Sequence, residues 1–495
     1  MKKRAKILSV LLALTMVVGL MGGCGSSSST SSSSESESSS EAEESSTETE
    51  EAEETASDDT SGEEDLFTVE VWGSSNSQGV LLTELIDEYN ETTGKELGIY
   101  IDFSYSSDIK NMLSLAQEND ELPLIVQSNS GITYEDGGYN IPFTMLPGGQ
   151  EFLDEWESAS GVAYGDWNKF AGSDDIYKIA YNFGGPALYY NEEMLIEAGF
   201  VDEDGNAQPP TTWSELVEYA EALTTDGVYG LAIPMQWSSY AEYDILMMGG
   251  GTEEDGLFTI DWDEQTYTFN VTGPLEAIKE IYQNGYCVPG AETIDNATAR
   301  SYFAEGVSAM FLGWTWDIAV FTTTYVADFD WDLDVLYAED GNNYGMLCSV
   351  GSWYSATTAV LDLTEEEQEK VMSVIEWLYG DEVGAMLVEA GVSFPLNNDH
   401  LESADSDAVL DQTYKIMDLL NEYGIMDVDL WNAWEYPRNY VDYDSSGAGW
   451  LCDNILLYCQ GEMTLDEYIT AANAAFTQGL QDAIADGAID PATYQ

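Results

Sequence analysis

Phe67-Thr-Val-Glu-Val-Trp72 alternates apolar and polar side chains, as a β-strand does when one of its faces is buried. Residues 80–89 follow with helical periodicity, residues 99–103 alternate again, and residues 122–126 form a short apolar run that suits a buried strand. The order strand, helix, strand predicts a parallel sheet joined by right-handed crossovers. The predicted fold class is therefore α/β.

Two later helices have recognisable N-terminal sequences. Thr212-Trp-Ser-Glu215 and Thr364-Glu-Glu-Glu367 each place a Glu three residues after a Thr, which is the spacing of a capping box. Apolar side chains then recur at helical spacing, with Trp213 and Trp377 on the apolar faces. We expect both indoles to be part of the core.

The stretch from residue 66 to residue 495 is too long for one hydrophobic core, because single cores rarely grow beyond about 250–300 residues. No long Pro- or Ser-rich linker interrupts it, and it contains no internal repeat. We therefore expect two lobes whose chain segments are interleaved rather than two domains in series.

The N-terminus has the composition of an export signal. Four basic residues within the first six positions precede an apolar run from Ile7 to Leu20, which is shorter than the roughly 20 residues that span a bilayer. Met21-Gly-Gly-Cys24 follows, and here the chain resembles a bacterial lipoprotein, whose signal is cleaved before a Cys that receives the lipid. The resemblance implies a signal peptide over residues 1–23 and a palmitate-type anchor on Cys24, so that the protein is held at the extracytoplasmic face of the cell membrane. An ordinary secretory peptide with an incidental Cys is the alternative.

The segment after this Cys, up to residue 65, consists of small and acidic residues and contains no aromatic residue. Such a composition buries too little apolar surface to offset the entropy of ordering. We expect residues 24–65, the lipidated Cys included, to form a disordered tether that holds the folded part away from the membrane.

The charge balance excludes several classes of function. The chain has 93 acidic and 13 basic residues, a formal charge of −80, so phosphate backbones would repel it and nucleic-acid binding is not expected. Its one histidine, His400, cannot supply a multi-histidine metal site. We expect no metal and no cofactor, and we interpret the acidity as a soluble face rather than as a site for cations.

Sequence signatures of catalysis are also missing. The chain has no Gly-x-Ser-x-Gly elbow, no His-Glu-x-x-His motif and no phosphate loop. A pair of carboxylates at the spacing of a glycosidase would occur by chance among so many acidic residues, so its presence would carry no information. We therefore predict that the protein is not an enzyme.

Besides Cys24 the chain has Cys287, Cys348, Cys452 and Cys459. Cys452 and Cys459 lie seven residues apart in a run with helical pattern, which is too far for them to bond to each other. For these four cysteines the sequence is compatible both with buried free thiols and with disulfides.

A family resemblance rests on several motifs in order. Leu188-Tyr-Tyr-Asn-Glu-Glu-Met-Leu-Ile-Glu-Ala-Gly-Phe200 and Pro209-Pro-Thr-Thr-Trp-Ser-Glu-Leu216 resemble the signature of extracellular solute-binding proteins of carbohydrate ABC importers. Phe303-Ala-Glu-Gly-Val-Ser-Ala-Met310 with Gly313-Trp-Thr-Trp-Asp317, and Gly351-Ser-Trp353 with Gly391-Val-Ser-Phe-Pro395, agree with later parts of that family's pattern. Leu122-Pro-Leu-Ile-Val126 departs from it, because the family has Pro-Asp before the apolar pair.

The resemblance implies a periplasmic-binding-protein-like fold of type II, with two interleaved α/β lobes, a hinge and a ligand cleft between them. Lobe one would comprise about residues 66–145 and 348–400, and lobe two about residues 146–347 and 401–495. It also implies a monomer that closes on a sugar or oligosaccharide and delivers it to the permease of an ABC importer.

The chemistry of sugars points to candidate residues. Sugars present flat C–H faces and a rim of hydroxyls, so a receptor needs aromatic rings for the faces and planar polar side chains for the rim. Aromatic residues stand beside Gly, Ser, Asn or Asp at several loop-like positions. The candidate ligand-binding residues are Trp72, Ser74, Ser75, Asn76, Trp237, Tyr240, Trp314, Asp317, Trp353, Trp434, Glu435 and Arg438.

Each candidate has a structural alternative. The alternatives are that the tryptophans pack in the core, that Asp317 is a carboxylate at a helix N-terminus, that Ser74 to Asn76 cap a helix, and that Arg438 forms a structural ion pair. Two other functions also stay open: binding of a non-sugar solute, and glycan binding or sensing at the cell surface without transport.

Overall fold

The computed structural model divides into two compact units, Met1–Leu66 and Phe67–Gln495. Residues 1–65, which include the predicted signal peptide, Cys24 and the tether, lie outside the described residues. The structure describes residues 66–495 apart from 74–75, 107–108, 129–138, 162–163, 165–167, 170–174, 180, 236–247, 249–257, 270, 340, 342–347, 351–352, 393, 424–436, 438–440, 442–449, 488 and 495.

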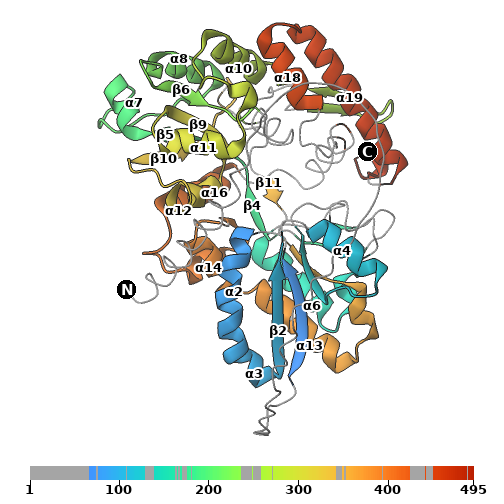
Figure 1. The fold of residues 1–495 in the computed structure, drawn as a ribbon. Helices are drawn as coiled ribbons and strands as arrows, with labels where there is room; N and C mark the ends of the chain where they lie inside the picture. The colour runs from blue at the N-terminus through green and yellow to red at the C-terminus, as the bar shows by residue number, and fades with distance from the viewer. Residues whose placement is uncertain are drawn as a thin grey trace, which may run out of the picture. The chain divides into compact units, whose positions relative to one another are not determined.

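The first sheet has four strands in the order β12-β3-β1-β2, and its strand β2 is labelled in Figure 1. Strand β1 pairs in parallel with both β2 and β3, whereas β12 comes from much later in the chain and runs antiparallel to β3. The strands are β1 (Phe67–Gly73), β2 (Ile99–Tyr105), β3 (Ile125–Ser128) and β12 (Trp353–Ala356).

The predicted strand–helix–strand order is confirmed in this sheet. Helix α2 (Asn76–Glu91) contains the predicted helical stretch and connects β1 to β2 through the short helix α3 (Thr93–Leu97). Helix α4 (Ile109–Glu118) then connects β2 to β3. The third strand begins at Ile125 rather than at Leu122, and Pro123, which has no N–H for a ladder, lies just before it.

The second sheet has the order β10-β5-β9-β6, with β9 antiparallel to β5 and parallel to β6. Every residue of β5 and β9 is buried, as expected of strands in the middle of a covered sheet. The strands are β5 (Pro186–Asn191), β6 (Tyr229–Ala232), β9 (Ser308–Trp314) and β10 (Trp331–Asp334).

Three short strands form a third sheet, in the order β11-β4-β13. Along the chain, β4 (Asn182–Gly184) lies between the first three strands of the first sheet and β5 of the second. Strand β11 (Cys348–Val350) follows the second sheet and precedes β12, and β13 (Phe394–Pro395) comes later. The chain therefore leaves the first sheet, builds the second, and returns to complete the first.

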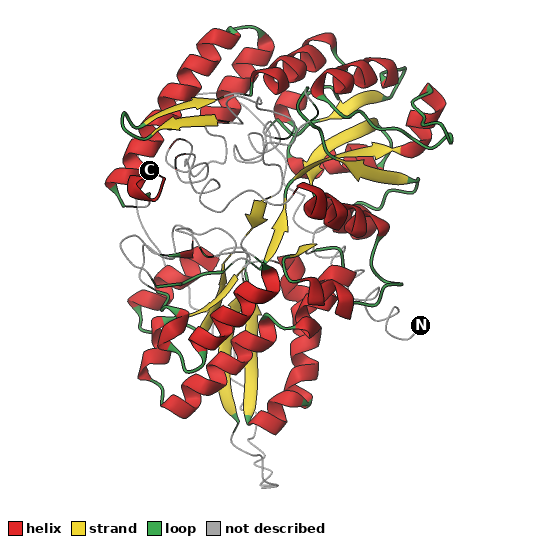
Figure 2. Cartoon of the chain, turned by 180° about the vertical axis from the view of Figure 1, so that it is seen from behind, coloured by secondary structure: helices red, strands yellow, loops and turns green. Residues whose placement is uncertain are grey.

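Helices surround these sheets, and Figure 2 shows how much of the described chain they make up. Thr364 and Glu367 form the predicted capping box at the start of α13. At the start of α8 the Thr212 hydroxyl accepts from the Glu215 N–H, but the Glu215 carboxylate accepts from Thr211. The remaining helices are α6 (Gly149–Ser160), α7 (Glu192–Ala198), α8 (Trp213–Leu223), α10 (Thr272–Asn284), α11 (Asn296–Ala304), α12 (Asp317–Thr323), α13 (Glu365–Leu378), α14 (Asp381–Glu389), α15 (Asn398–Ser403), α16 (Asp411–Tyr423), α18 (Trp450–Gln460) and α19 (Leu465–Ala485), with short 3-10 turns η1 (Phe143–Met145), η3 (Ala291–Thr293), η4 (Thr358–Asp362) and η5 (Pro491–Tyr494).

Helix side chains close two sheet edges. The Asn90 amide of α2 accepts from the Ile101 N–H at 2.7 Å and donates to the Ile101 carbonyl at 2.9 Å, on the edge strand β2. In the hairpin of β7 (Phe258–Asp261) and β8 (Thr266–Phe269), two β8 N–H groups donate to Thr477 and Asn473 of α19, each at 2.9 Å. These helices therefore satisfy backbone groups that would otherwise template another strand.

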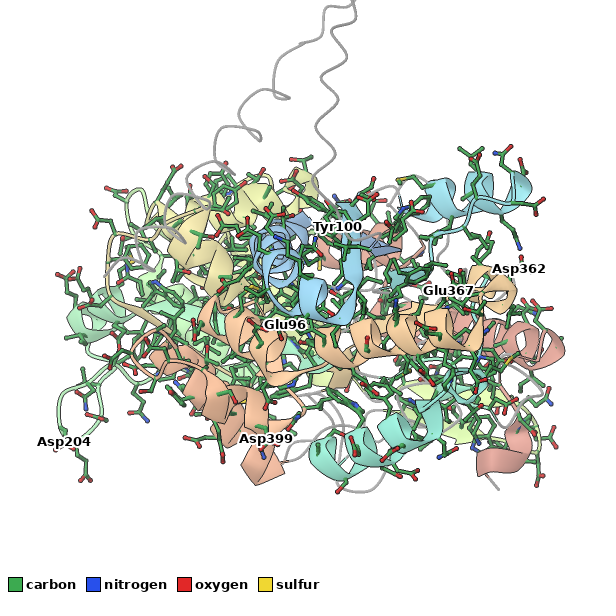
Figure 3. The ribbon with its side chains drawn as sticks, turned by 90° about the horizontal axis from the view of Figure 1, so that it is seen from below. Glu96, Tyr100, Asp204, Asp362, Glu367 and Asp399 are labelled. Carbon is green, nitrogen blue, oxygen red and sulfur yellow. The ribbon has the colours of Figure 1, made fainter. Side chains whose placement is uncertain are left out.

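Apolar side chains and thiols form the core, and acidic side chains lie on the surface. Trp213 is buried as predicted, and Trp377 is half-buried against the core. Cys287 and Cys459 are buried free thiols, and burial raises the pKa of the Cys287 thiol to about 11. Acidic side chains such as Glu96, Asp204, Asp362 and Asp399 are exposed (Figure 3). Within the described part of the chain, no helix has both the length and the apolar character needed to cross a bilayer.

Candidate functional site

The structure describes only part of the predicted binding site. Trp72, Trp314 and Asp317 are described with their side chains, and Asn76 and Trp353 by their place in the backbone. The other predicted residues lie outside the described part of the chain and stay predictions: Ser74, Ser75, Trp237, Tyr240, Trp434, Glu435 and Arg438.

Three predicted residues meet at one end of the first sheet. Trp72 is the second-last residue of β1, and Asn76 begins α2 directly beyond that strand. In the ladders, Trp72 lies opposite Val126 of β3, and Trp353 lies opposite Ser128, two residues further along the same strand. Register therefore brings Trp353 beside the carboxyl ends of β1 and β3, where ligands bind in open α/β sheets.

Trp72 is held by short-range contacts. Its indole N–H donates to the Glu70 carboxylate at 2.8 Å, on the same strand. The half-buried ring packs against a small apolar cluster that is separate from the main core. Part of the ring is left available for contact with another molecule. The cluster consists of Ile109, Leu113, Val126 and Tyr139.

Trp314 lies at the carboxyl end of β9 in the second sheet, and it is 2 % exposed. Its ring stacks on Trp316, with the centroids 4.3 Å apart and the planes at 16°. Trp316 is half-buried. The chain thus presents two nearly parallel indoles, of which Trp316 is the more accessible.

The turn that carries this pair is restrained at several backbone atoms. The Tyr189 hydroxyl donates to the carbonyls of Trp314 and Thr315, at 2.7 and 3.2 Å. The Thr315 N–H donates to the Gly185 carbonyl at 2.9 Å, and the Gly185 N–H donates to the Thr315 hydroxyl at 3.3 Å. Strand β5 therefore fixes the point at which β9 ends.

Asp317 is fully buried, and both of its carboxylate oxygens have partners within the chain. Oδ1 forms an ion pair with the Arg300 guanidinium of α11, and Oδ2 accepts from the backbone N–H of Trp314 at 3.0 Å. Burial raises the pKa of Asp317, while Arg300 and the Trp314 N–H act in the opposite direction. Asp317 is thus positioned to fix the turn, and the hypothesis that it binds ligand hydroxyls directly stays a prediction.

Sequence reasoning missed three residues of this arrangement, namely Trp316, Tyr189 and Arg300. Trp316 had a local signal, because it stands two residues after Trp314 in an otherwise apolar stretch. Tyr189 and Arg300 had none, since their roles depend on the pairing of β5 with β9 and on the packing of α11 beside Asp317.

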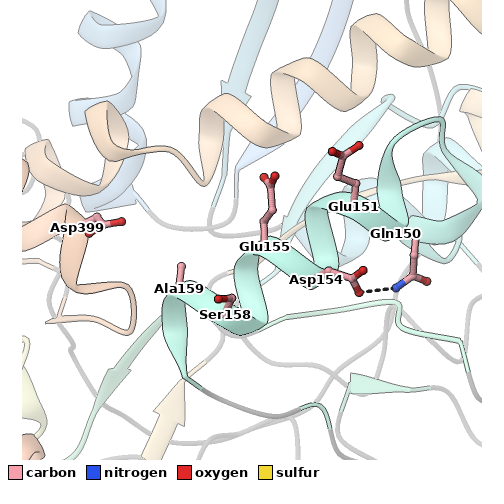
Figure 4. Close-up of a pocket in the computed structure, with 7 residues that line it drawn as sticks. All are labelled: Gln150, Glu151, Asp154, Glu155, Ser158, Ala159 and Asp399. Carbon is pink, nitrogen blue, oxygen red and sulfur yellow. Dashed lines mark hydrogen bonds between the residues drawn. The ribbon is translucent and has the colours of Figure 1, made fainter.

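A hollow of about 740 Å³ lies elsewhere, along α6 (Figure 4). Its lining is acidic and contains no aromatic ring, so it lacks the surface that a sugar face needs. Among the residues that the structure describes, no group of three or more His, Cys, Asp or Glu side chains is placed to hold a metal ion. The lining residues are Gln150, Glu151, Asp154, Glu155, Ser158, Ala159 and Asp399.

Residues 84–412 match the family of bacterial extracellular solute-binding proteins. The chain belongs to this family. The match includes both four-stranded sheets except for β1, and it includes the Trp314–Trp316 turn.

Solved structures show the same fold. One is the GacH receptor of Streptomyces glaucescens, solved unliganded and with acarbose, at a TM-score of 0.61 and 17% identity, covering 84% of this chain and 99% of that one. Another is the maltose/maltodextrin-binding domain MalE of Bdellovibrio bacteriovorus bound to maltotriose, at a TM-score of 0.56 and 17% identity, covering 84% and 100%. The predicted binding-protein fold with two α/β lobes is confirmed by these likenesses.

A curated relative is named for a ligand other than the oligosaccharides of these structures. The sn-glycerol-3-phosphate-binding periplasmic protein UgpB of Brucella abortus is 24% identical over 247 residues, which are 48% of this chain and 54% of the relative. The match with the curated relatives thus spans about half of their length. Family and fold are those of binding proteins rather than of enzymes.

Proposed function

We propose that the protein captures a sugar or oligosaccharide outside the cell and delivers it to the permease of an ABC importer. The observation that carries the proposal is the stacked Trp314–Trp316 pair at the end of β9. Flat indole faces suit the C–H faces of sugar rings, and the about 0.5–1.5 kcal/mol that aromatic pairs contribute beyond their buried area gives the scale of such a stacking contact. The acarbose and maltotriose complexes of proteins with this fold support the same ligand class.

Capture would proceed by hinge closure between two lobes, about residues 66–145 with 348–400 and about 146–347 with 401–495. Sheet membership supports this division, because β12 joins strands from residues 67–128 while the second sheet uses residues 186–334. A ligand that touches both lobes shifts the population towards the closed form by its differential affinity.

The end of the first sheet would supply the second half of the binding surface. Trp72 has a half-buried ring there, Asn76 begins α2, and Trp353 begins β12 beside them. Indole and amide are the side-chain types that stack on sugar faces and bond to sugar hydroxyls, so the residue types at this end of the sheet fit the proposed ligand.

Thermal unfolding of the purified protein tests the ligand class. The probes are maltotriose, acarbose, xylotriose and sn-glycerol 3-phosphate, with glycine as the control. A ligand at 100 times its dissociation constant stabilises the fold by about 2.7 kcal/mol, which raises the midpoint clearly. A shift with a glycan, without glycan breakdown on standing, supports the proposal.

The other outcomes separate the alternatives. A shift with sn-glycerol 3-phosphate alone would keep the solute-binding role and exclude the sugar. Breakdown of the glycan would indicate an enzyme. Binding to a glycan without any loss of uptake when the gene is deleted would indicate a surface receptor that does not serve transport.

We also propose that Cys24 carries the lipid that holds the protein at the membrane. The support is the sequence at residues 1–24 and the extracellular character of the family. Metabolic labelling with a palmitate analogue should mark the wild type, whereas the variant Cys24→Ala should stay unlabelled and leave the membrane fraction. A labelled C24A protein would contradict the assignment.

A further inference from the structure

A buried ion pair between Arg300 and Asp317 lies next to the Trp314–Trp316 turn. Asp317 is fully buried, and its Oδ2 accepts from the Trp314 N–H at 3.0 Å while its Oδ1 pairs with Arg300. Taking two charges out of water costs several kcal/mol per ion, so a buried pair is weak evidence for stability. Geometry offers a more specific role for this one.

The carboxylate meets the backbone at the residue where β9 ends. A side chain at Gly313 would clash with the carboxylate, since a Cβ built there lies 2.4 Å from Asp317 Oδ2 and 2.2 Å from the Phe311 ring. Only glycine therefore lets the carboxylate approach the strand end this closely. The approach places Oδ2 against the N–H of the first indole residue of the pair.

Arg300 fixes the carboxylate from the other side. It lies on α11, and its side chain is 18% exposed, while that of Asp317 is 0% exposed. Because the guanidinium has a planar set of donors in a rigid fork, it restricts the orientation of the carboxylate more than an ammonium would. The contacts thus form a chain from α11 through Asp317 to Trp314, whose ring stacks on Trp316.

We propose that Arg300, acting through Asp317, is a positioning residue that holds the Trp314–Trp316 pair in the geometry of a ligand platform, with Trp316 as the ring that meets the ligand. Trp314 is 2 % exposed and backs Trp316, which is half-buried. In this arrangement Asp317 contributes to affinity without touching the ligand. The inference rests on the proposed function for the ligand, but not for the geometry of the rings.

The double variant Arg300→Met with Asp317→Asn removes both charges while keeping similar side-chain volumes. Two stacked indoles give an exciton couplet in far-ultraviolet circular dichroism, and the variant Trp316→Phe identifies that couplet by difference. We expect R300M/D317N to lose most of the couplet and about tenfold in affinity for whichever probe stabilises the wild type. R300K, which keeps the charge but lacks the planar fork, should retain more of both than R300M/D317N does.

A matched control removes another ion pair from the same sheet. Lys415 of α16 pairs with Asp332 of β10 at 2.8 Å, and these two side chains also contact Asp334 and the Tyr190 hydroxyl rather than residues of the Trp turn. The double variant Lys415→Met with Asp332→Asn is charge-neutral in the same way. It should lower the unfolding midpoint but leave the couplet and the affinity unchanged.

Three results would overturn the inference. They are that R300M/D317N keeps both couplet and affinity, that it loses the couplet yet binds as before, and that the K415M/D332N control shows the same losses. If the double variant does not fold, the couplet and affinity of Asp317→Asn alone test the inference. This variant removes the charge but keeps the side-chain volume and an acceptor for the backbone N–H of Trp314. If no probe stabilises the wild type, the proposed function fails, and the couplet alone then supports or overturns the positioning of the rings.

Discussion

The carboxyl ends of the two four-stranded sheets place their tryptophans by different means. At the first sheet, Trp72 is held by Glu70, two residues away, and by a small separate cluster. At the second, Trp314 is held by Tyr189, 125 residues away, and by a carboxylate whose partner lies on another helix. The polar partner of Trp72 is thus a neighbour in sequence, although the cluster under its ring is not, whereas the turn at Trp314 is also fixed by polar partners from distant parts of the chain.

This difference has a functional consequence. A ring with few restraints adapts to its ligand but loses freedom when it binds, at a cost of about 0.5–1.5 kcal/mol per immobilised side chain. A ring that is already fixed avoids that cost. We therefore expect the second sheet to provide the rigid part of the binding surface and the first sheet the adaptable part.

The largest expected effect comes from deleting a ring at each end. Trp314→Ala should lower the free energy of unfolding by about 3–5 kcal/mol, as is usual for a large buried aromatic side chain. Trp72→Ala should cost clearly less, because its ring is half-buried against a small cluster. Denaturant titration of both variants measures the comparison, and equal losses would contradict it.

A second prediction concerns the closed edge of the first sheet. Asn90→Ala leaves an N–H and a carbonyl of Ile101 without their partner in a site where Ile101 is 1% exposed. Each unsatisfied buried group costs about 1–3 kcal/mol, so the two together would cost about 2–6 kcal/mol, and we expect the lower half of that range because water can partly reach a sheet edge.

The control for the sheet edge is Asn119, an exposed residue whose amide donates to the Leu115 carbonyl. Asn119→Ala should change the free energy of unfolding by no more than about 0.5 kcal/mol. A small effect of N90A, similar to that of N119A, would show that water replaces the amide at this edge.

A third prediction concerns the outer strand of the second sheet. Lys415 lies 2.8 Å from Asp332 and 3.3 Å from Asp334. Burial lowers the pKa of Lys415, but the Asp334 and Asp332 carboxylates outweigh it and raise the pKa above its ordinary value. Lys415→Met should cost about 1 kcal/mol, since the groups are partly exposed and screened by solvent.

High salt should reduce that loss, because mobile ions screen the carboxylates that Lys415 leaves behind. A double-mutant cycle with Asp332→Asn measures the coupling of the pair. A coupling energy of zero would mean that α16 is held to β10 by packing alone.

The smallest effect is a pH dependence of stability that arises from His400. Its ring centroid lies 5.8 Å from that of Tyr181, the residue before β4. The Nε2 atom lies 3.0 Å from the Tyr379 carbonyl, and Asp381 lies 4.0 Å away. Burial lowers the pKa of His400 from 6.5, although the Tyr379 carbonyl and the Asp381 and Asp399 carboxylates raise it in part.

The sign follows from the lowered pKa. Below about pH 6.5 the unfolded chain takes up a proton on this residue more readily than the folded chain does, so stability falls as the pH falls towards the folded pKa. The slope is at most about 1.4 kcal/mol per pH unit. His400→Gln should make the unfolding midpoint depend less on pH between about pH 5 and 7 than it does in the wild type.

No other histidine contributes, because His400 is the only one in the chain. Burial raises the pKa of Glu376, with Glu155 and Glu151 adding to the rise, and that change stabilises the fold as the pH falls. The wild type and H400Q share this opposite contribution, so it cancels in their difference. An identical slope in the two proteins would contradict the prediction.

Much of the architecture follows from short stretches of sequence. Alternation in β1, the helical period of α2 and the capping box at Thr364 each depend on residues within a few positions of one another, and all three appear as predicted. The start of β3 was misplaced by three residues. The apolar pattern there does not mark where the ladder begins.

The site shows the limit of such reasoning. Resemblance to the family indicates the motif around Trp314, and the side-by-side aromatic and polar residues indicate Trp72, Asn76 and Trp353. Their meeting at one sheet end is a matter of register, since Trp353 reaches β3 only through the late strand β12.

The sequence by itself determined the α/β class, the positions of several helices and the resemblance to solute-binding proteins, because these depend on local pattern and on motif order. Only the tertiary structure decided that Trp314 is the covered ring and Trp316 the accessible one, that Arg300 is the partner of Asp317, and that Asn90 closes β2. The physical reason is that burial and ion pairing depend on which distant segments pack together.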